Sequence, residues 1–174
     1  MNKLPDFEIK PCGEISNEFL KINIVNFQDA CQYIAKLPYR RNLDKNDLKT
    51  IFADNCGTCG TKHAILKKLA EENEFEGLKL MLGIFKMNAQ NTVAVTETLK
   101  RYNLEFIPEA HNYLKFENEI LDFTKRNSSA SDFEDSLLLE IEMLSNQISH
   151  YKVEFHKEFL KKWLTENPEI EFNI

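Results

Sequence analysis

Residues 55–63 read Asn-Cys-Gly-Thr-Cys-Gly-Thr-Lys-His and run directly into Ala-Ile-Leu-Lys-Lys-Leu-Ala-Glu-Glu at residues 64–72. In the second stretch apolar residues recur at helical spacing, with lysines and glutamates on the other side. Thr58 is the predicted N-cap, because its hydroxyl can accept a backbone N–H two or three residues later. Cys59 then lies in the first turn, where free N–H groups and the helix dipole favour a thiolate. This stretch therefore predicts a helix that presents a nucleophile.

The neighbours of Cys59 fit that interpretation. Gly57 and Gly60 lack a Cβ atom, so we expect them to leave room for backbone or substrate close to the sulfur. Cys56 is the other cysteine of the segment, but it precedes the predicted cap. We therefore assign the reactive thiolate to Cys59 and not to Cys56.

A β-hairpin is predicted over residues 108–124, where two apolar-rich runs surround Glu-Asn-Glu at residues 117–119. With a turn at residues 117–118, the alternation of side chains places His111 and Asp122 on one face as diagonal neighbours. A three-residue turn would separate them. A carboxylate beside an imidazole fixes its tautomer and supports its protonated form.

Together these segments resemble the transglutaminase-like branch of the papain-like cysteine enzymes. The resemblance rests on Gly-Thr-Cys at residues 57–59 opening a helix, His111 on a strand and Asp122 in Leu-Asp-Phe-Thr, and it covers residues 55–125. It implies an α+β fold with a papain/transglutaminase-like core, in which a helix bearing Cys59 packs on an antiparallel sheet bearing His111 and Asp122.

The resemblance also implies a reaction. Cys59 would be the nucleophile that attacks an amide or ester carbonyl, His111 the base and Asp122 the group that orients it. Backbone N–H groups at the helix start, with the side chain of Asn55 as a further donor, would bind the oxyanion. Water as acceptor gives a hydrolase and an amine gives a transferase, and the sequence leaves both open. A small-molecule or peptide substrate is expected, with no cofactor and no metal.

An alternative function is a catalytically inactive domain that keeps this fold and binds a ligand in the cleft. Residues 37–42 form a predicted loop in which Tyr39, Arg40 and Arg41 follow a proline. A guanidinium pair at the cleft would bind a substrate carboxylate, whereas a solvated turn would give these residues no role.

Other interpretations of the cysteine segment stay open at this stage. Cys56, Cys59 and His63 would make half of a zinc site, but Cys12 and Cys31 are not spaced as the second half. A redox pair at residues 56 and 59 needs a preceding strand, and the preceding residues look helical. His63, four residues after Cys59, would share its helix face and would have to compete with His111 as the base.

Length, composition and charge limit the number of domains, the partners and the location. The 174 residues are 43% hydrophobic with few Gly or Pro, which predicts one globular domain over residues 1–174. A formal charge of −6 predicts no nucleic-acid partner. No apolar run approaches the ~20 residues of a membrane span, and residues 1–7 lack the apolar segment of a secretion signal. Four cysteines are too few for a disulfide scaffold, so a cytoplasmic location is expected.

The remaining patterns predict the elements around this core. Residues 19–25 alternate as a strand or extended segment, and residues 135–141 are ambiguous between helix and strand. The other predicted elements are a helix from the Asn26 cap to Pro38, a short helix over 43–53, a strand over 78–87, a helix over 92–102 capped by Asn91, a loop over 125–131 and a helix over 151–164.

Overall fold

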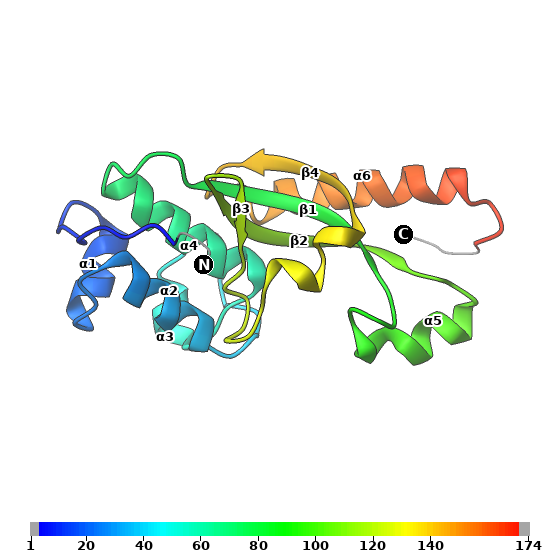
Figure 1. Ribbon diagram of the computed structural model, residues 1–174, viewed down its shortest axis with the longest axis horizontal. Helices are drawn as coiled ribbons and strands as arrows, with labels where there is room; N and C mark the ends of the chain where they lie inside the picture. Colours follow the sequence, from blue (N-terminus) through cyan, green and yellow to red (C-terminus); the bar gives the residue numbers. More distant parts are fainter. Residues whose placement is uncertain (1–3, 171–174) are drawn as a thin grey trace.

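The computed structural model describes residues 4–170 and has an α+β architecture (Figure 1). A four-stranded antiparallel sheet has the order β3-β2-β1-β4. Its strands are β1 (Lys79–Met87), β2 (Ile107–Phe116), β3 (Glu119–Leu121) and β4 (Leu137–Met143). The helices are α1 (Glu14–Lys21), α2 (Phe27–Lys36), α3 (Thr50–Asp54), α4 (Cys59–Glu72), α5 (Thr96–Tyr102) and α6 (His150–Glu166). Short 3-10 turns cover Val93–Val95, Ala130–Asp132 and Glu134–Ser136.

Helix α4 is the centre of the core. It packs against β1 and β2 on one side and against α1 and α2 on the other, so it is buried nearly all round over its first turns. Figure 1 shows α1 to α3 gathered around it at one end of the molecule, while α5 and α6 lie toward the other end. A helix enclosed in this way is held in place by apolar contacts on every side. Its first residue, Cys59, is therefore fixed relative to the sheet.

The hairpin has the predicted register. Phe116 pairs with Glu119 and Leu114 with Leu121, so residues 117 and 118 form the turn. Glu117 and Asn118 both have positive φ, at 48° and 69°, as a two-residue turn between right-twisted strands requires. Asp122 follows directly after β3, on the side of the hairpin predicted from the alternation.

Strand β2 continues well beyond its short partner. Pairing with β3 ends at Leu114, so the half of β2 that carries His111 and Asn112 has β1 on one edge and no strand on the other within the described residues. Adjacent residues of a strand point to opposite faces of the sheet. Asn112 lies on the face covered by α4, whereas His111 lies on the face that holds Phe85 and Phe133.

Two predicted elements were wrong. Residues 19–25 do not form a strand, because α1 occupies Glu14–Lys21 and its first turn is capped from a distance. The carboxylate of Glu72, at the end of α4, accepts the backbone N–H groups of Ile15 and Ser16 at 3.1 and 2.7 Å. The helix predicted over 43–53 is confined to Thr50–Asp54.

Among the other elements, the predicted Asn26 cap is confirmed and the predicted Asn91 cap is wrong. Asn26 caps α2 through the backbone N–H of Asp29, and the ambiguous segment near residue 137 is the edge strand β4. The predicted cap Asn91 does not cap a helix, because its Oδ1 accepts the backbone N–H of Asn88. Within residues 4–170, none of the helices combines the length and the apolar character needed to cross a bilayer.

Candidate active site

Cys59 is the first residue of α4, and the predicted cap is present. Thr58 accepts the backbone N–H of Thr61, and the Thr61 hydroxyl accepts the N–H of Thr58 in return. The N–H groups of Cys59 and Gly60 have no acceptor within the described residues. Free N–H groups at the positive end of a helix attract a negative charge.

The two glycines serve a different purpose from the one expected. A Cβ atom at Gly60 would lie 3.3 Å from Asn112 Oδ1, and one at Gly57 would lie 3.0 Å from the side chains of Lys62 and Thr61. The space beside each glycine is thus filled by the protein itself. Gly60 lets Asn112 approach the first turn of α4.

His111 and Asp122 are brought together. His111 Nε2 lies 2.9 Å from Asp122 Oδ2, and the carboxylate side chain is only 3% exposed. Asp122 Oδ1 accepts the backbone N–H of Thr124 at 2.8 Å, which fixes the orientation of the carboxylate. Although burial raises the pKa of Asp122, the hydrogen bond and the charge of His111 hold that pKa far below its usual range.

The environment of the Cys59 sulfur favours a thiolate. Burial raises the pKa of this thiol, but the charge of Lys152 and the hydrogen bond and charge of His111 together bring it well below 9.0. Lys152 Nζ lies 3.5 Å from Sγ. Since His111 Nε2 is bound to Asp122, the ring nitrogen that faces the thiol is Nδ1. Although burial lowers the pKa of His111, its bonds to Asp122 and Cys59 raise it to about 9.

His63 occupies a fixed place between these groups, with both ring nitrogens bonded to the backbone. Its Nδ1 lies 2.7 Å from the carbonyl oxygen of Cys59, and its Nε2 accepts the backbone N–H of Phe123 at 2.7 Å. The carbonyl requires a proton on Nδ1, and the N–H requires a lone pair on Nε2, so the neutral Nδ1–H tautomer fits both. With both nitrogens engaged, His63 is available neither to a metal nor to a substrate.

Lys62, like His63, is bonded to the segment at residues 123–124. Its side chain is fully buried, and Nζ donates to the carbonyl oxygens of Leu37 and Thr124. Burial lowers the pKa of Lys62 to about 8, against the attraction of Asp122. Lys62 and His63, adjacent on α4, therefore hold residues 123–124 in place next to Asp122.

Two cavities lie on either side of Tyr39, and Cys59 lines the larger of them. One, of about 640 Å³, is lined by Cys59, Gly60, Glu109, Lys152 and His156 among others. The other, of about 270 Å³, is lined by residues that include His111, Asp122, Phe85 and Phe133. Tyr39 lines both, and its hydroxyl lies 4.0 Å from Cys59 Sγ. The charge of Cys59, followed by burial, raises the pKa of this tyrosine.

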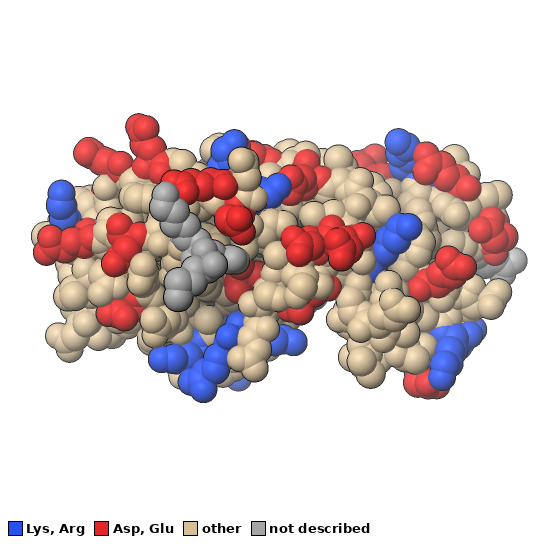
Figure 2. All heavy atoms as spheres, viewed as in Figure 1, with Lys and Arg blue, Asp and Glu red and all other residues tan. Residues whose placement is uncertain are grey.

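The structure separates the other expected binding residues. Arg41 lines the larger cavity beside Cys59, whereas Arg40 is exposed and donates to the carbonyl of Asp54 at 3.3 Å. Figure 2 shows lysine and arginine side chains gathered along one edge, over the region of α3 and the loop after β3. Asn55 is exposed and has the left-handed backbone conformation that ends α3. It is not among the described residues that line the two cavities.

Cys56 and the remaining cysteines lie apart from this chemistry. Cys56 is fully buried, and its Sγ lies 3.9 Å from the carbonyl oxygen of Arg41. Cys31 lies in the core on the buried side of α2. Cys12 is exposed, and its thiol donates to the carbonyl of Glu72. Residues 4–170 contain no group of three or more His, Cys, Asp or Glu side chains arranged to hold a metal ion.

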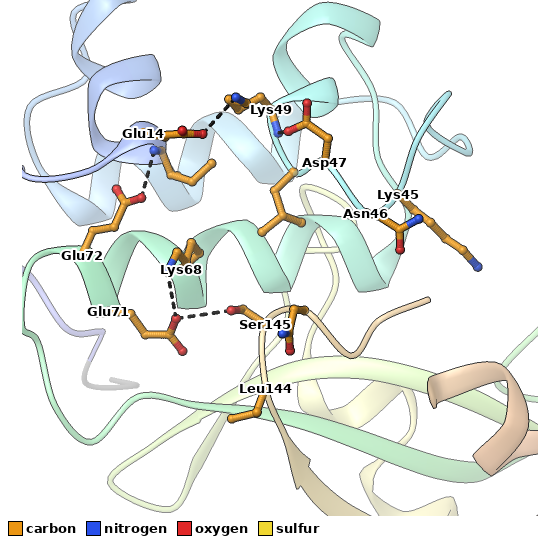
Figure 3. Close-up of a pocket in the computed structure, with 13 residues that line it drawn as sticks. Glu14, Lys45, Asn46, Asp47, Lys49, Lys68, Glu71, Glu72, Leu144 and Ser145 are labelled. Carbon is orange, nitrogen blue, oxygen red and sulfur yellow. Dashed lines mark hydrogen bonds and ion pairs between the residues drawn. The ribbon is translucent and has the colours of Figure 1, made fainter. Parts of the chain in front are cut away.

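A further cavity of about 550 Å³ lies along α4 toward its C-terminal end, among charged side chains (Figure 3). These groups pair with one another. Lys49 bonds to Glu14 at 2.9 Å, and Ser145 donates to Glu71 at 3.2 Å. Another carboxylate of the group, that of Glu72, caps α1. This cavity is thus bordered by side chains that already satisfy each other, and it does not include Cys59.

Two polar residues at the thiol gave no signal in the sequence. Asn112 is fully buried and bonds to Lys152, which comes from α6, 93 residues beyond Cys59. In the sequence Lys152 is one lysine among several on an amphipathic helix, so only the packing of α6 along β2 identifies it.

Comparison of the chain with protein-family models, with curated proteins and with solved structures found no match.

Proposed function

We propose that the chain is a cysteine-dependent acyl-transfer enzyme with a papain/transglutaminase-like core. The observation that carries the proposal is the contact of His111 Nε2 with Asp122, 2.9 Å long, on an imidazole whose other nitrogen faces a thiol at the start of a buried helix. A nucleophile, a base and a group that orients the base are the parts that acyl transfer through a covalent intermediate needs.

The steps follow from the protonation states. The Cys59 thiolate attacks the carbonyl carbon of an amide or ester, and an S–C bond forms while the carbonyl π electrons move to oxygen. When the C=O bond re-forms, the bond to the leaving group breaks, and the leaving group takes the proton from the His111 imidazolium. Neutral His111 then removes a proton from water or an amine, which attacks the thioester and releases Cys59.

Asp122 stabilises the imidazolium form of His111 in every step. It accepts a hydrogen bond from His111 Nε2–H without taking the proton and stays ionised, since its own pKa is held far below its usual range. The free N–H groups of Cys59 and Gly60 supply hydrogen bonds for the oxyanion at the helix start. Tyr39, half exposed with its hydroxyl near the thiol, lines both cavities.

The test uses p-nitrophenyl acetate as the acyl donor. Release of p-nitrophenolate should be accompanied by an acetyl group on Cys59 in intact-mass and peptide spectra, and the adduct should then be lost by hydrolysis or by transfer to an added amine. Cys59→Ser should abolish the fast phase, while Cys12→Ser, a change at an exposed cysteine remote from the site, should not.

Two results would count against the proposal. An acetyl group found on Cys12 but not on Cys59 would remove the nucleophile. A Cys59 that reacts with iodoacetamide no faster than a free thiol near neutral pH would favour the alternative, an inactive domain that binds a ligand in the cleft.

A further inference from the structure

Lys152 is the second cation at the thiol, and the steps above do not use it. Its Nζ lies 3.5 Å from Cys59 Sγ and donates to Asn112 Oδ1 at 2.8 Å. An ammonium carries three protons, so these two contacts leave one proton for a further acceptor. The side chain is half-buried and lines the larger cavity. A substrate bound in that cavity can therefore supply the acceptor for the third proton.

The position of Lys152 is fixed by buried groups. Asn112 is fully buried, and its Nδ2 donates to the carbonyl of Met81 at 2.9 Å, which turns Oδ1 toward the ammonium. Gly60 permits this approach, since a Cβ atom there would lie 3.3 Å from Asn112 Oδ1. The ammonium is therefore oriented before any substrate arrives, which is the condition for effective electrostatic catalysis.

Lys152 and His111 approach the sulfur from opposite sides. Asn112 and His111 are adjacent on β2, so their side chains lie on opposite faces of the sheet. The two groups also line different cavities, Lys152 the larger one and His111 the smaller one. A tetrahedral intermediate on Sγ needs its leaving group near the base and its charged oxygen near a donor, and these two sides provide both.

We infer that Lys152 is a catalytic residue that binds the oxyanion, so that the acyl oxygen points into the larger cavity and the leaving group lies on the His111 side. This inference rests on the proposed function. An oxygen two bonds from Sγ is within reach of an ammonium 3.5 Å from Sγ, at the donor distance of about 2.7–3.1 Å that oxyanion sites use. No proton is transferred, and Lys152 holds the charge until the C=O bond re-forms.

The other charged groups of this cavity are compatible with that role. Glu109 also lines it, and burial raises the pKa of this carboxyl. The ring of His156 is held by the carbonyl of Pro108 at 2.9 Å. Arg41 lies in the same lining and adds positive charge.

The experiment compares two reactions of the same thiolate. Alkylation by iodoacetamide forms no oxyanion, whereas acetylation by p-nitrophenyl acetate does. Each is measured for wild type, Lys152→Met, Lys152→Gln and Lys152→Arg at a pH on the plateau of that variant's own alkylation profile, so that the thiolate fraction is equal. The control is Lys157→Met on the exposed side of α6, where Lys157 pairs with Glu154.

Lys152→Met should lower the acetylation rate about 10²–10³-fold and leave plateau alkylation nearly unchanged. Lys152→Arg should recover part of the loss, and Lys152→Gln, which can still bond to Asn112, keeps the test valid if the methionine variant unfolds. An equal loss in both reactions would overturn the inference and restrict Lys152 to stabilising the thiolate. A wild type that is alkylated rapidly but never acetylated would overturn the proposed function first, and the inference with it.

Discussion

Replacing Asp122 by Asn should disable the base while leaving the fold in place. Asp122 Oδ1 accepts the Thr124 N–H at 2.8 Å, and an asparagine oxygen can keep that bond. The amide NH₂ then faces His111 Nε2, where it needs a lone pair. His111 would hold its proton on Nδ1, pointing at Cys59, and could not accept the proton of the thiol.

The size of the effect follows from the pKa of His111. The pKa of His111 rises from 6.5 to about 9, which corresponds to about 3 kcal/mol in favour of the imidazolium. Burial opposes this rise, and the hydrogen bonds to Asp122 and then to Cys59 cause it. If Asp122 and Cys59 contribute equally, loss of Asp122 lowers the population of the thiolate–imidazolium pair roughly tenfold. With the wrong tautomer added, acetylation of Cys59 should fall by about 10³–10⁴-fold.

Stopped-flow acetylation by p-nitrophenyl acetate and the pH profile of iodoacetamide alkylation measure this. The alkylation profile should shift to higher pH, because the imidazolium that stabilises the thiolate is lost. Asp132→Asn is the control, since Asp132 lines the same cavity but bonds to the backbone of Ser129. An Asp122→Asn variant that keeps the wild-type rate and profile would refute the assignment of His111 as the base.

Three further predictions concern residues around the thiol. Limiting iodoacetamide followed by peptide mapping should label Cys59 before Cys56, which is fully buried; the reverse order would exchange their roles. Lys62 has a folded-state pKa of about 8 against 10.5, so the unfolded chain binds more protons between these values and this group makes stability rise with pH there. Chemical denaturation should show that Lys62→Met loses this rise, up to about 3 kcal/mol, and an unchanged pH dependence would contradict the burial of its charge. Arg41→Ala should slow alkylation by iodoacetate relative to iodoacetamide, and Arg40→Ala should not, because only Arg41 lines the cavity of Cys59; equal effects with a lower melting temperature would make both structural.

The sequence determined the features that depend on neighbours along the chain. The Thr58 cap and the first turn of α4 involve residues three apart, and the turn at residues 117–118 sets which residues of the hairpin face each other. These rules are local, so His111 and Asp122 could be paired from the alternation alone. The roles of Cys59, His111 and Asp122 in catalysis remain predictions.

Tertiary packing decided the rest. The alternation over residues 19–25 predicts a strand or extended segment, but α1 continues to Lys21 and is capped by Glu72, more than fifty residues away. The environment of the thiol depends in the same way on distant groups. Lys152 reaches Cys59 only because α6 packs along β2, and Lys62 and His63 appear in the sequence as ordinary residues of a helix until residues 123–124 bond to them. A buried charge needs partners from several elements at once, and no periodicity along one element reveals which partners it will meet.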